Sequence, residues 1–212
     1  MTQNLLLIQK EYLQKVWLRK PEELETCIPA MRQGPCLHLK AFGEPCELYP
    51  GEIILGGQPL TGPQGILIAM YASHVPNEKL QLHPLKSFKQ FPGSMAYQGA
   101  FTLNAEKILI PYVPAIKEHE QDLVIRFSGH SNLDAPIGDF SFTLFPLPRI
   151  ALYYTFYLPD DEFSAAVTCL FPSNATKFMP LAGLADTAEF TARKIIELVG
   201  KGESLEDNRF GR

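Results

Sequence analysis

The sequence predicts an α+β fold in which an antiparallel sheet, including a three-stranded unit at residues 139–171, packs with several helices. That unit alternates apolar and polar residues with the two-residue period of β-strands. A second set of short alternating segments lies at residues 36–55. Residues 4–19 and 181–199 instead space their apolar residues as amphipathic helices do.

These segments follow one another irregularly, and no unit of the sequence repeats. We therefore expect a single α+β domain over residues 1–201, with a division near residue 93 as the alternative. The remaining residues, 202–212, are expected to form a mobile C-terminal tail.

The N-terminal part is predicted to be helical. Residues 4–19 place their apolar side chains along one stripe of a helix. A second, shorter helix is expected to begin at Pro21, because Glu22 and Glu23 then lie in its first turn, where the helix dipole favours acidic side chains. Residues 31–35 are expected to form a loop.

Residues 36–42, 46–49 and 52–55 are predicted to form a small antiparallel meander, because each segment is short and glycine and proline mark the turns between them. A loop is expected at residues 56–59. No strand–glycine-loop–lysine pattern follows the glycines of this loop, so it is not a phosphate-binding loop.

The middle of the chain is predicted to be mainly helical. Residues 65–73 are apolar almost all round, which favours a buried helix over the alternative of a core strand. Residues 97–109 and 118–127 are also predicted as helices, the second closed by Gly129, with a strand at residues 123–127 as the competing interpretation.

Three strands are predicted at residues 139–145, 150–158 and 164–171, and proline is expected to end the first of them. One face of these strands is apolar and should contact the core. The opposite face carries Ser141, Thr143, Tyr153, Thr155, Tyr157 and Thr168. This polar face is either a second packing face under a helix or one wall of a ligand cleft. Residues 181–199 follow as a long helix that Gly200 is expected to end.

Composition limits the classes of partner. The chain has 212 residues with a net charge of −4, so charge gives no support to a nucleic-acid or anionic-membrane partner. No apolar run reaches the length of a membrane span, and the N-terminus lacks the basic start of a signal peptide. We therefore expect a cytoplasmic protein.

The cysteines predict no metal site. No two of them have the two-residue gap of a zinc or iron–sulfur knuckle. A site in which Cys27, Cys36 and Cys46 join His38 is the less favoured alternative. Cys169 lies on the apolar face of a predicted strand and is expected to be an inert buried thiol.

The turn at residues 160–162 consists of three consecutive acidic residues, Asp160, Asp161 and Glu162. Such a run usually keeps a turn in water. The alternative is an oxygen-ligand site for a hard divalent cation, because neighbouring side chains diverge and one carboxylate could face the strands.

Four short blocks carry a family resemblance. They are Gly138-Asp139, Phe145 to Ile150, Asp160 to Phe163, and Leu170-Phe171 followed by a helix. In this order and spacing the chain resembles the DUF3786 family, a bacterial domain of unknown function found mainly in anaerobes, over residues 36–198.

The resemblance implies little chemistry. Some relatives carry a cysteine-rich segment suited to an iron–sulfur cluster, which associates the family loosely with corrinoid or iron–sulfur methyl-transfer metabolism. This chain has no such segment, so no cofactor is identified. The resemblance marks Asp139, Arg149, Asp161 and Glu162 as positions that match the family pattern, with no assigned role.

We therefore expect an accessory or small-ligand-binding protein of anaerobic metabolism, without an identifiable catalytic motif. The expected ligand-binding residues are Asp139, Arg149, Tyr153, Tyr157, Asp161 and Glu162. The alternatives are a divalent-cation-dependent enzyme that uses the acidic turn and a protein–protein adaptor. The expected partner is a small molecule or another protein, and a homo-oligomer stays open.

Overall fold

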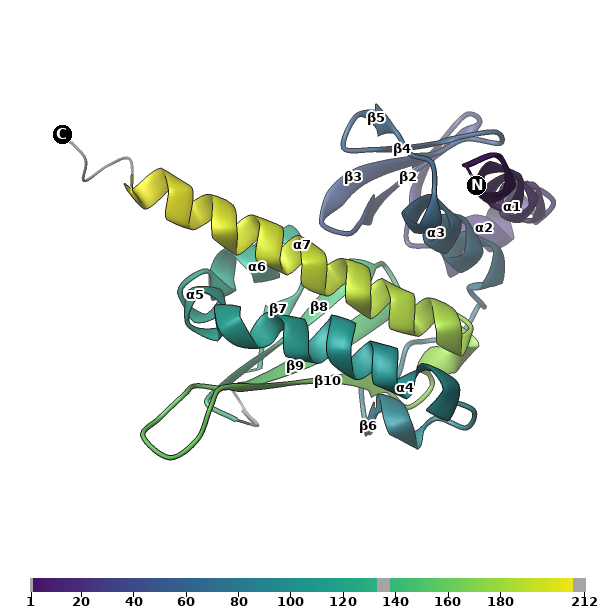
Figure 1. Ribbon diagram of the computed structural model, residues 1–212. Helices are drawn as coiled ribbons and strands as arrows, with labels where there is room; N and C mark the ends of the chain where they lie inside the picture. The colour runs from purple at the N-terminus through teal and green to yellow at the C-terminus, as the bar shows by residue number, and fades with distance from the viewer. Residues whose placement is uncertain (1, 133–137, 208–212) are drawn as a thin grey trace.

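The computed structural model describes residues 2–132 and 138–207, and its fold is α+β, as predicted. The chain begins with α1 (Thr2–Trp17) and α2 (Pro21–Cys27), so both N-terminal helices are confirmed. Helix α3 (Pro63–His74) packs against α1, which confirms a helix rather than a core strand for this apolar segment. The three helices lie beside the first sheet (Figure 1).

The first sheet is an antiparallel meander with the order β1-β2-β3-β4-β5. Its strands are β1 (Met31–Gln33), β2 (Cys36–Ala41), β3 (Glu44–Leu48), β4 (Ile53–Leu55) and β5 (Gln58–Pro59). The meander was predicted, but the loops expected at residues 31–35 and 56–59 are in part edge strands. These strands have three and two residues, which is too short for an alternating pattern to show.

The second sheet is also antiparallel and has the order β6-β10-β9-β8-β7. Its strands are β6 (Leu85–Ser87), β7 (His130–Ser131), β8 (Phe140–Leu147), β9 (Ile150–Tyr157) and β10 (Ala166–Pro172). The predicted three-stranded unit is therefore confirmed as the centre of this sheet. Proline does not end β8 as expected, because an irregular register between Leu144 and Leu147 carries the strand past Pro146.

A series of short helices connects β6 to β7 of the second sheet. It comprises α4 (Met95–Phe101), the π-helical η2 (Thr102–Glu106), the 3₁₀ segments η1 (Phe88–Gln90) and η3 (Lys107–Tyr112), α5 (Val113–Glu118) and α6 (Glu120–Arg126). The predicted helices are confirmed, and the competing strand at residues 123–127 is wrong. After η4 (Ala175–Lys177), α7 (Leu181–Asp207) continues through Gly200 instead of ending there. Residues 208–212 of the expected tail lie outside the described residues.

The helices cover one face of the second sheet. Figure 1 shows α4, α5 and α7 across this face, with α7 running along much of the molecule. The interface between helices and sheet is aromatic: Phe140 and Phe156 of the sheet stack with ring centroids 4.6 Å apart, and Phe88 of η1 stacks on Phe101 of α4 at 4.4 Å. Burial of these rings provides much of the hydrophobic stabilisation of this layer.

Polar contacts join the two sheets. The backbone N–H of Phe42, after β2, donates a 2.6 Å hydrogen bond to the carbonyl oxygen of Pro146 in β8. Nearby, the Glu44 carboxylate pairs with Arg126 of α6 and, at 3.2 Å, with Lys194 of α7. Burial opposes ionisation of Glu44, but these two cations outweigh it and lower the pKa of the carboxyl. Within the described ranges, every helix is too short or too polar to span a lipid bilayer.

Candidate functional site

Arg149, one of the residues expected to bind a ligand, is engaged within the protein. Its guanidinium donates hydrogen bonds to the carbonyl oxygens of Pro76 (3.1 Å), Glu78 (2.6 Å) and Thr26 (2.7 Å). Its backbone N–H also donates to the hydroxyl of Tyr71 at 3.1 Å. These bonds fix the segment that follows α3 and give Arg149 an architectural role.

Asp139 closes one end of the second sheet. Its carboxylate accepts a 2.7 Å hydrogen bond from the N–H of Leu158, and its own N–H donates to the carbonyl oxygen of Phe156 at 2.9 Å. The two bonds hold β8 against the end of β9. Asp139 is therefore occupied by the backbone of its own sheet.

The acidic turn lies on a loop between β9 and β10 that extends from the body of the molecule (Figure 1). Asp160 accepts hydrogen bonds from the N–H groups of Glu162 (2.9 Å) and Phe163 (2.7 Å), which stabilises the turn itself. Asp161 and Glu162 are exposed. Among the described residues, three potential metal ligands converge elsewhere and not at this turn.

The two tyrosines of β9 lie in different environments although they share a face. Tyr153 is 6% exposed, whereas Tyr157 is 43% exposed near the end of the strand. Tyr153 lines a pocket to which Tyr157 does not contribute. The structure therefore separates Tyr153 from the other residues that were expected to bind a ligand.

Sheet register places a continuous row of side chains around Tyr153. Across the sheet, His130 of β7 lies opposite Thr143 of β8, which lies opposite Tyr153. The row continues through Leu170 of β10 to Ser87 of β6. Directly paired residues point to the same face of a sheet. The row thus brings residues from five strands to one polar face.

Hydrogen bonds order this face but leave two of its buried polar groups, those of Asn132 and Thr155, without a partner among the described residues. The Tyr153 hydroxyl lies 3.2 Å from the Ser141 hydroxyl, and the Thr143 hydroxyl donates to Oδ1 of Asn132 at 3.2 Å. The amide nitrogen Nδ2 of Asn132 is buried, and no group in the part of the chain that the structure describes accepts a hydrogen bond from it. A buried donor without a partner is rare and costly in native proteins.

A small pocket of about 30 Å³ opens at this donor. Its polar lining consists of His83, His130, Asn132, Thr143 and Tyr153, and its apolar lining includes Leu82 and Leu85. The two imidazoles are exposed, whereas Thr143 and Tyr153 are buried. A volume of this size holds one small polar group. The donors of Asn132 and Tyr153 suit an oxygen acceptor, such as a carboxylate, carbonyl or phosphate oxygen.

Sequence reasoning identified Thr143 and Tyr153 through strand alternation, but it missed the residues that complete the pocket. His130 and Asn132 belong to or follow a strand of two residues, and His83 comes from the loop before β6. No local pattern indicates that these segments meet β8 and β9. The convergence of His83 and His130 depends on tertiary structure alone.

The less favoured cysteine set is only partly brought together. Cys36 and His38 share one face of β2, whereas Cys27 and Cys46 are buried in the core. Burial raises the pKa of the Cys46 thiol to about 12, and Cys36 and Glu47 add to the effect. Cys46 also lies on the core face of the sheet, opposite to the face that carries Cys36 and His38. Cys169 is buried as expected.

Comparison with known proteins gives a family but no activity. The matching family model is described as a domain of unknown function, DUF3786, and it covers residues 20–194. This confirms the family that the sequence blocks resemble and extends the similarity to α2. No curated protein and no solved structure matches the chain.

Proposed function

The chain belongs to the DUF3786 family of domains of unknown function, and we propose that it binds a small ligand in the pocket beside Tyr153. The ligand presents an oxygen acceptor, such as a carboxylate or a phosphate, to this pocket. We include in this proposal the role in anaerobic metabolism that the family resemblance implies. The protein should therefore be purified without oxygen.

The buried amide nitrogen of Asn132, which has no acceptor among the described residues, is the observation that carries the proposal. It lies at a pocket that Tyr153 also lines, and the Tyr153 hydroxyl lies 3.2 Å from the hydroxyl of Ser141. A bound acceptor would satisfy the amide and gain a second hydrogen bond from the tyrosine. Two such bonds in a partly buried site stabilise binding by about 1–3 kcal/mol.

The pocket is too small for a whole metabolite, so it recognises one group of the ligand. The rest of the molecule would lie at the mouth, between the exposed imidazoles of His83 and His130. Protonated imidazoles there would favour a negatively charged ligand. Leu82 and Leu85 provide an apolar edge against which a carbon skeleton could pack.

Native mass spectrometry of protein purified anaerobically from its own host tests the proposal first. We expect a mass above the denatured mass by that of one small acidic molecule. A clean mass of the bare chain, together with no chemical-shift change on adding acetate or inorganic phosphate, would reject ligand binding and favour the protein–protein adaptor.

Two variants then localise the site. Tyr153→Phe removes one hydroxyl and should weaken binding about tenfold, the effect of one hydrogen bond. Asn132→Asp replaces the free donor by a carboxylate and should abolish binding of an anion. The matched control is Tyr157→Phe, which makes the same change on the same face of β9 but outside the pocket. Equal effects of the two tyrosine variants would place the ligand elsewhere.

A further inference from the structure

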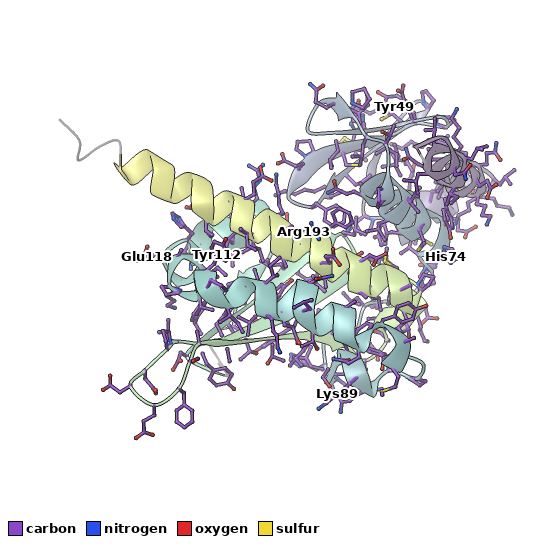
Figure 2. All side chains as sticks on the ribbon, in the orientation of Figure 1. Tyr49, His74, Lys89, Tyr112, Glu118 and Arg193 are labelled. Atoms are coloured by element: carbon purple, nitrogen blue, oxygen red, sulfur yellow. The ribbon has the colours of Figure 1, made fainter. Side chains whose placement is uncertain are left out.

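A second group of polar side chains lies on the first sheet, apart from the pocket beside Tyr153. Cys36 and His38 are two residues apart on β2, so their side chains point to the same face. Glu47 of β3 is the direct cross-strand partner of His38. Tyr49, labelled in Figure 2, follows β3 on the same face, because it is two residues from Glu47.

The potential ligand atoms of this group converge. One atom each from Cys36, His38 and Glu47 lies within 4.8 Å of the others. Two atoms bound to one tetrahedral zinc ion lie about 3.3–3.6 Å apart, given bond lengths of about 2.0–2.3 Å. An approach of about one ångström therefore suffices to bind an ion. Side-chain rotation supplies this movement, because His38 and Glu47 are only half-buried.

The three side chains converge without pairing directly. No residue that the structure describes forms a hydrogen bond or an ion pair with the His38 ring, although a carboxylate and a thiol are nearby. A histidine and a glutamate in mutual contact would be expected at about 2.8 Å. Their wider separation leaves room for an ion between them.

Tyr49 orients one of these groups. Its hydroxyl donates a 2.9 Å hydrogen bond to Oε2 of Glu47, which leaves the other carboxylate oxygen available. A hydrogen-bonded carboxylate is a common supporting feature of metal sites, since it fixes the ligand in one orientation. Cys36 is 3% exposed, and its sulfur lies within 4.8 Å of the ligand atoms of His38 and Glu47.

We propose that Cys36, His38 and Glu47 bind a divalent transition-metal ion of the zinc class, with Tyr49 as a positioning residue. A sulfur, a nitrogen and an oxygen ligand suit zinc, and the thiolate and carboxylate balance the charge of the ion. Magnesium and calcium prefer oxygen ligands throughout and are poor candidates. Three protein ligands leave a fourth position for water or another small ligand.

This site is independent of the pocket beside Tyr153, and neither proposal needs the other. It differs from the arrangement that the cysteines alone suggested, because Glu47 takes the place of Cys27 and Cys46. The spacing of two residues between Cys36 and His38 is visible in the sequence, but the third ligand is contributed by sheet pairing.

Cobalt titration tests the proposal directly. Full-length protein is treated with a chelator, and Co²⁺ is added under anaerobic conditions. We expect one equivalent to produce a thiolate-to-cobalt charge-transfer band and intense visible bands of tetrahedral cobalt, and Zn²⁺ to displace both. Absence of a charge-transfer band in the folded wild-type protein would overturn the proposal.

Single variants assign the ligands. Cys36→Ser should remove the charge-transfer band, and His38→Gln and Glu47→Gln should each weaken Co²⁺ binding at least tenfold. Tyr49→Phe should keep the band but lower the affinity about tenfold, as expected for a positioning residue. Circular dichroism tests whether each variant is folded. Glu47→Gln is the mildest change, because the amide oxygen can still accept the hydrogen bond from the Tyr49 hydroxyl.

Two controls separate this site from adventitious binding. Cys46→Ala removes a thiol from the opposite, core-facing side of the same sheet and should leave the band intact. His74→Gln removes an exposed imidazole of α3, outside both proposed sites, and should leave the affinity unchanged. Loss of the band in Cys46→Ala with retention in Cys36→Ser, or equal weakening by His74→Gln and His38→Gln, would contradict the assignment.

Discussion

Oε1 of Glu106 accepts a 3.0 Å hydrogen bond from the backbone N–H of Cys169. The bond joins the π-helical segment η2 to β10, between the helix layer and the second sheet. Burial raises the pKa of Glu106, although the N–H of Cys169 and the hydroxyl of Thr102 both favour its ionised form. Burial likewise raises the pKa of the neighbouring Tyr154 and Cys169.

The first prediction concerns Glu106→Gln. In the folded protein the pKa of Glu106 lies above the unfolded value of 4.5. Its contribution to stability is therefore favourable at low pH and is lost as pH rises through the folded pKa. The neutral amide keeps the acceptor for Cys169, so the variant should be more stable than wild type at neutral pH, and equally stable below pH 4.5.

Urea denaturation at a series of pH values measures this difference. Glu118→Gln is the matched control, because Glu118 is an exposed side chain of α5 (Figure 2) and the same change there should leave the pH profile unaltered. A neutral-pH destabilisation of Glu106→Gln would show that the charged carboxylate is required.

The second prediction has the opposite sign. The pKa of Glu44 is lowered by Arg126 and Lys194, so its ionised form stabilises the folded state above the unfolded pKa of 4.5. This contribution is lost as pH falls through the lowered folded pKa. Glu44→Gln should cost about 1 kcal/mol at neutral pH, and the deficit should disappear in acid. A deficit that persisted in acid would indicate lost packing and not lost charge.

The fold could be predicted wherever a segment is long enough to show its period. The helix at residues 181–199 and the strands at residues 139–171 extend over several periods, and both are confirmed. Edge strands β1 and β5 were missed, because partner strands and not their own sequence determine them. Gly200 does not end α7, because glycine lowers helix propensity only modestly and does not prevent continuation.

The candidate sites were less predictable. Alternation correctly assigned Thr143 and Tyr153 to one face, since it follows from strand geometry alone. The meeting of His83 and His130 with that face requires the loop before β6 and the edge strand β7 to be in place. Likewise, pairing of β2 with β3 decides that Glu47, and not Cys46, lies beside His38.

The third prediction concerns the anchor at Arg149. The single ammonium group of lysine cannot reach all three carbonyl oxygens to which the guanidinium donates hydrogen bonds. Arg149→Lys should therefore destabilise the protein by roughly 2 kcal/mol, because at least one hydrogen bond from a charged donor is lost. It should also increase hydrogen exchange in the segment from Pro76 to His83. Arg193→Lys is the control, since Arg193 makes an exposed i,i+4 ion pair (Figure 2) and should change stability by less than about 0.5 kcal/mol.

The fourth prediction compares two glycines. A Cβ on Gly129 would lie 2.0 Å from the carbonyl oxygen of Thr143, so Gly129→Ala must move β7 away from β8. We expect a loss of about 3 kcal/mol or more, the range of severe backbone clashes. Because His130 and Asn132 follow directly, the variant should also lose ligand binding at the pocket, while Co²⁺ binding by the first sheet is retained.

Gly99 provides the matched substitution for this last prediction. It lies in α4, and a Cβ there would meet no atom within 4 Å. Gly99→Ala should therefore stabilise the protein by roughly 0.5–1 kcal/mol, through reduced backbone freedom of the unfolded chain. Urea denaturation measures both variants. Equal stability of Gly129→Ala and wild type would mean that β7 is not held against β8, and the pocket beside Tyr153 would then lack the wall from which Asn132 donates.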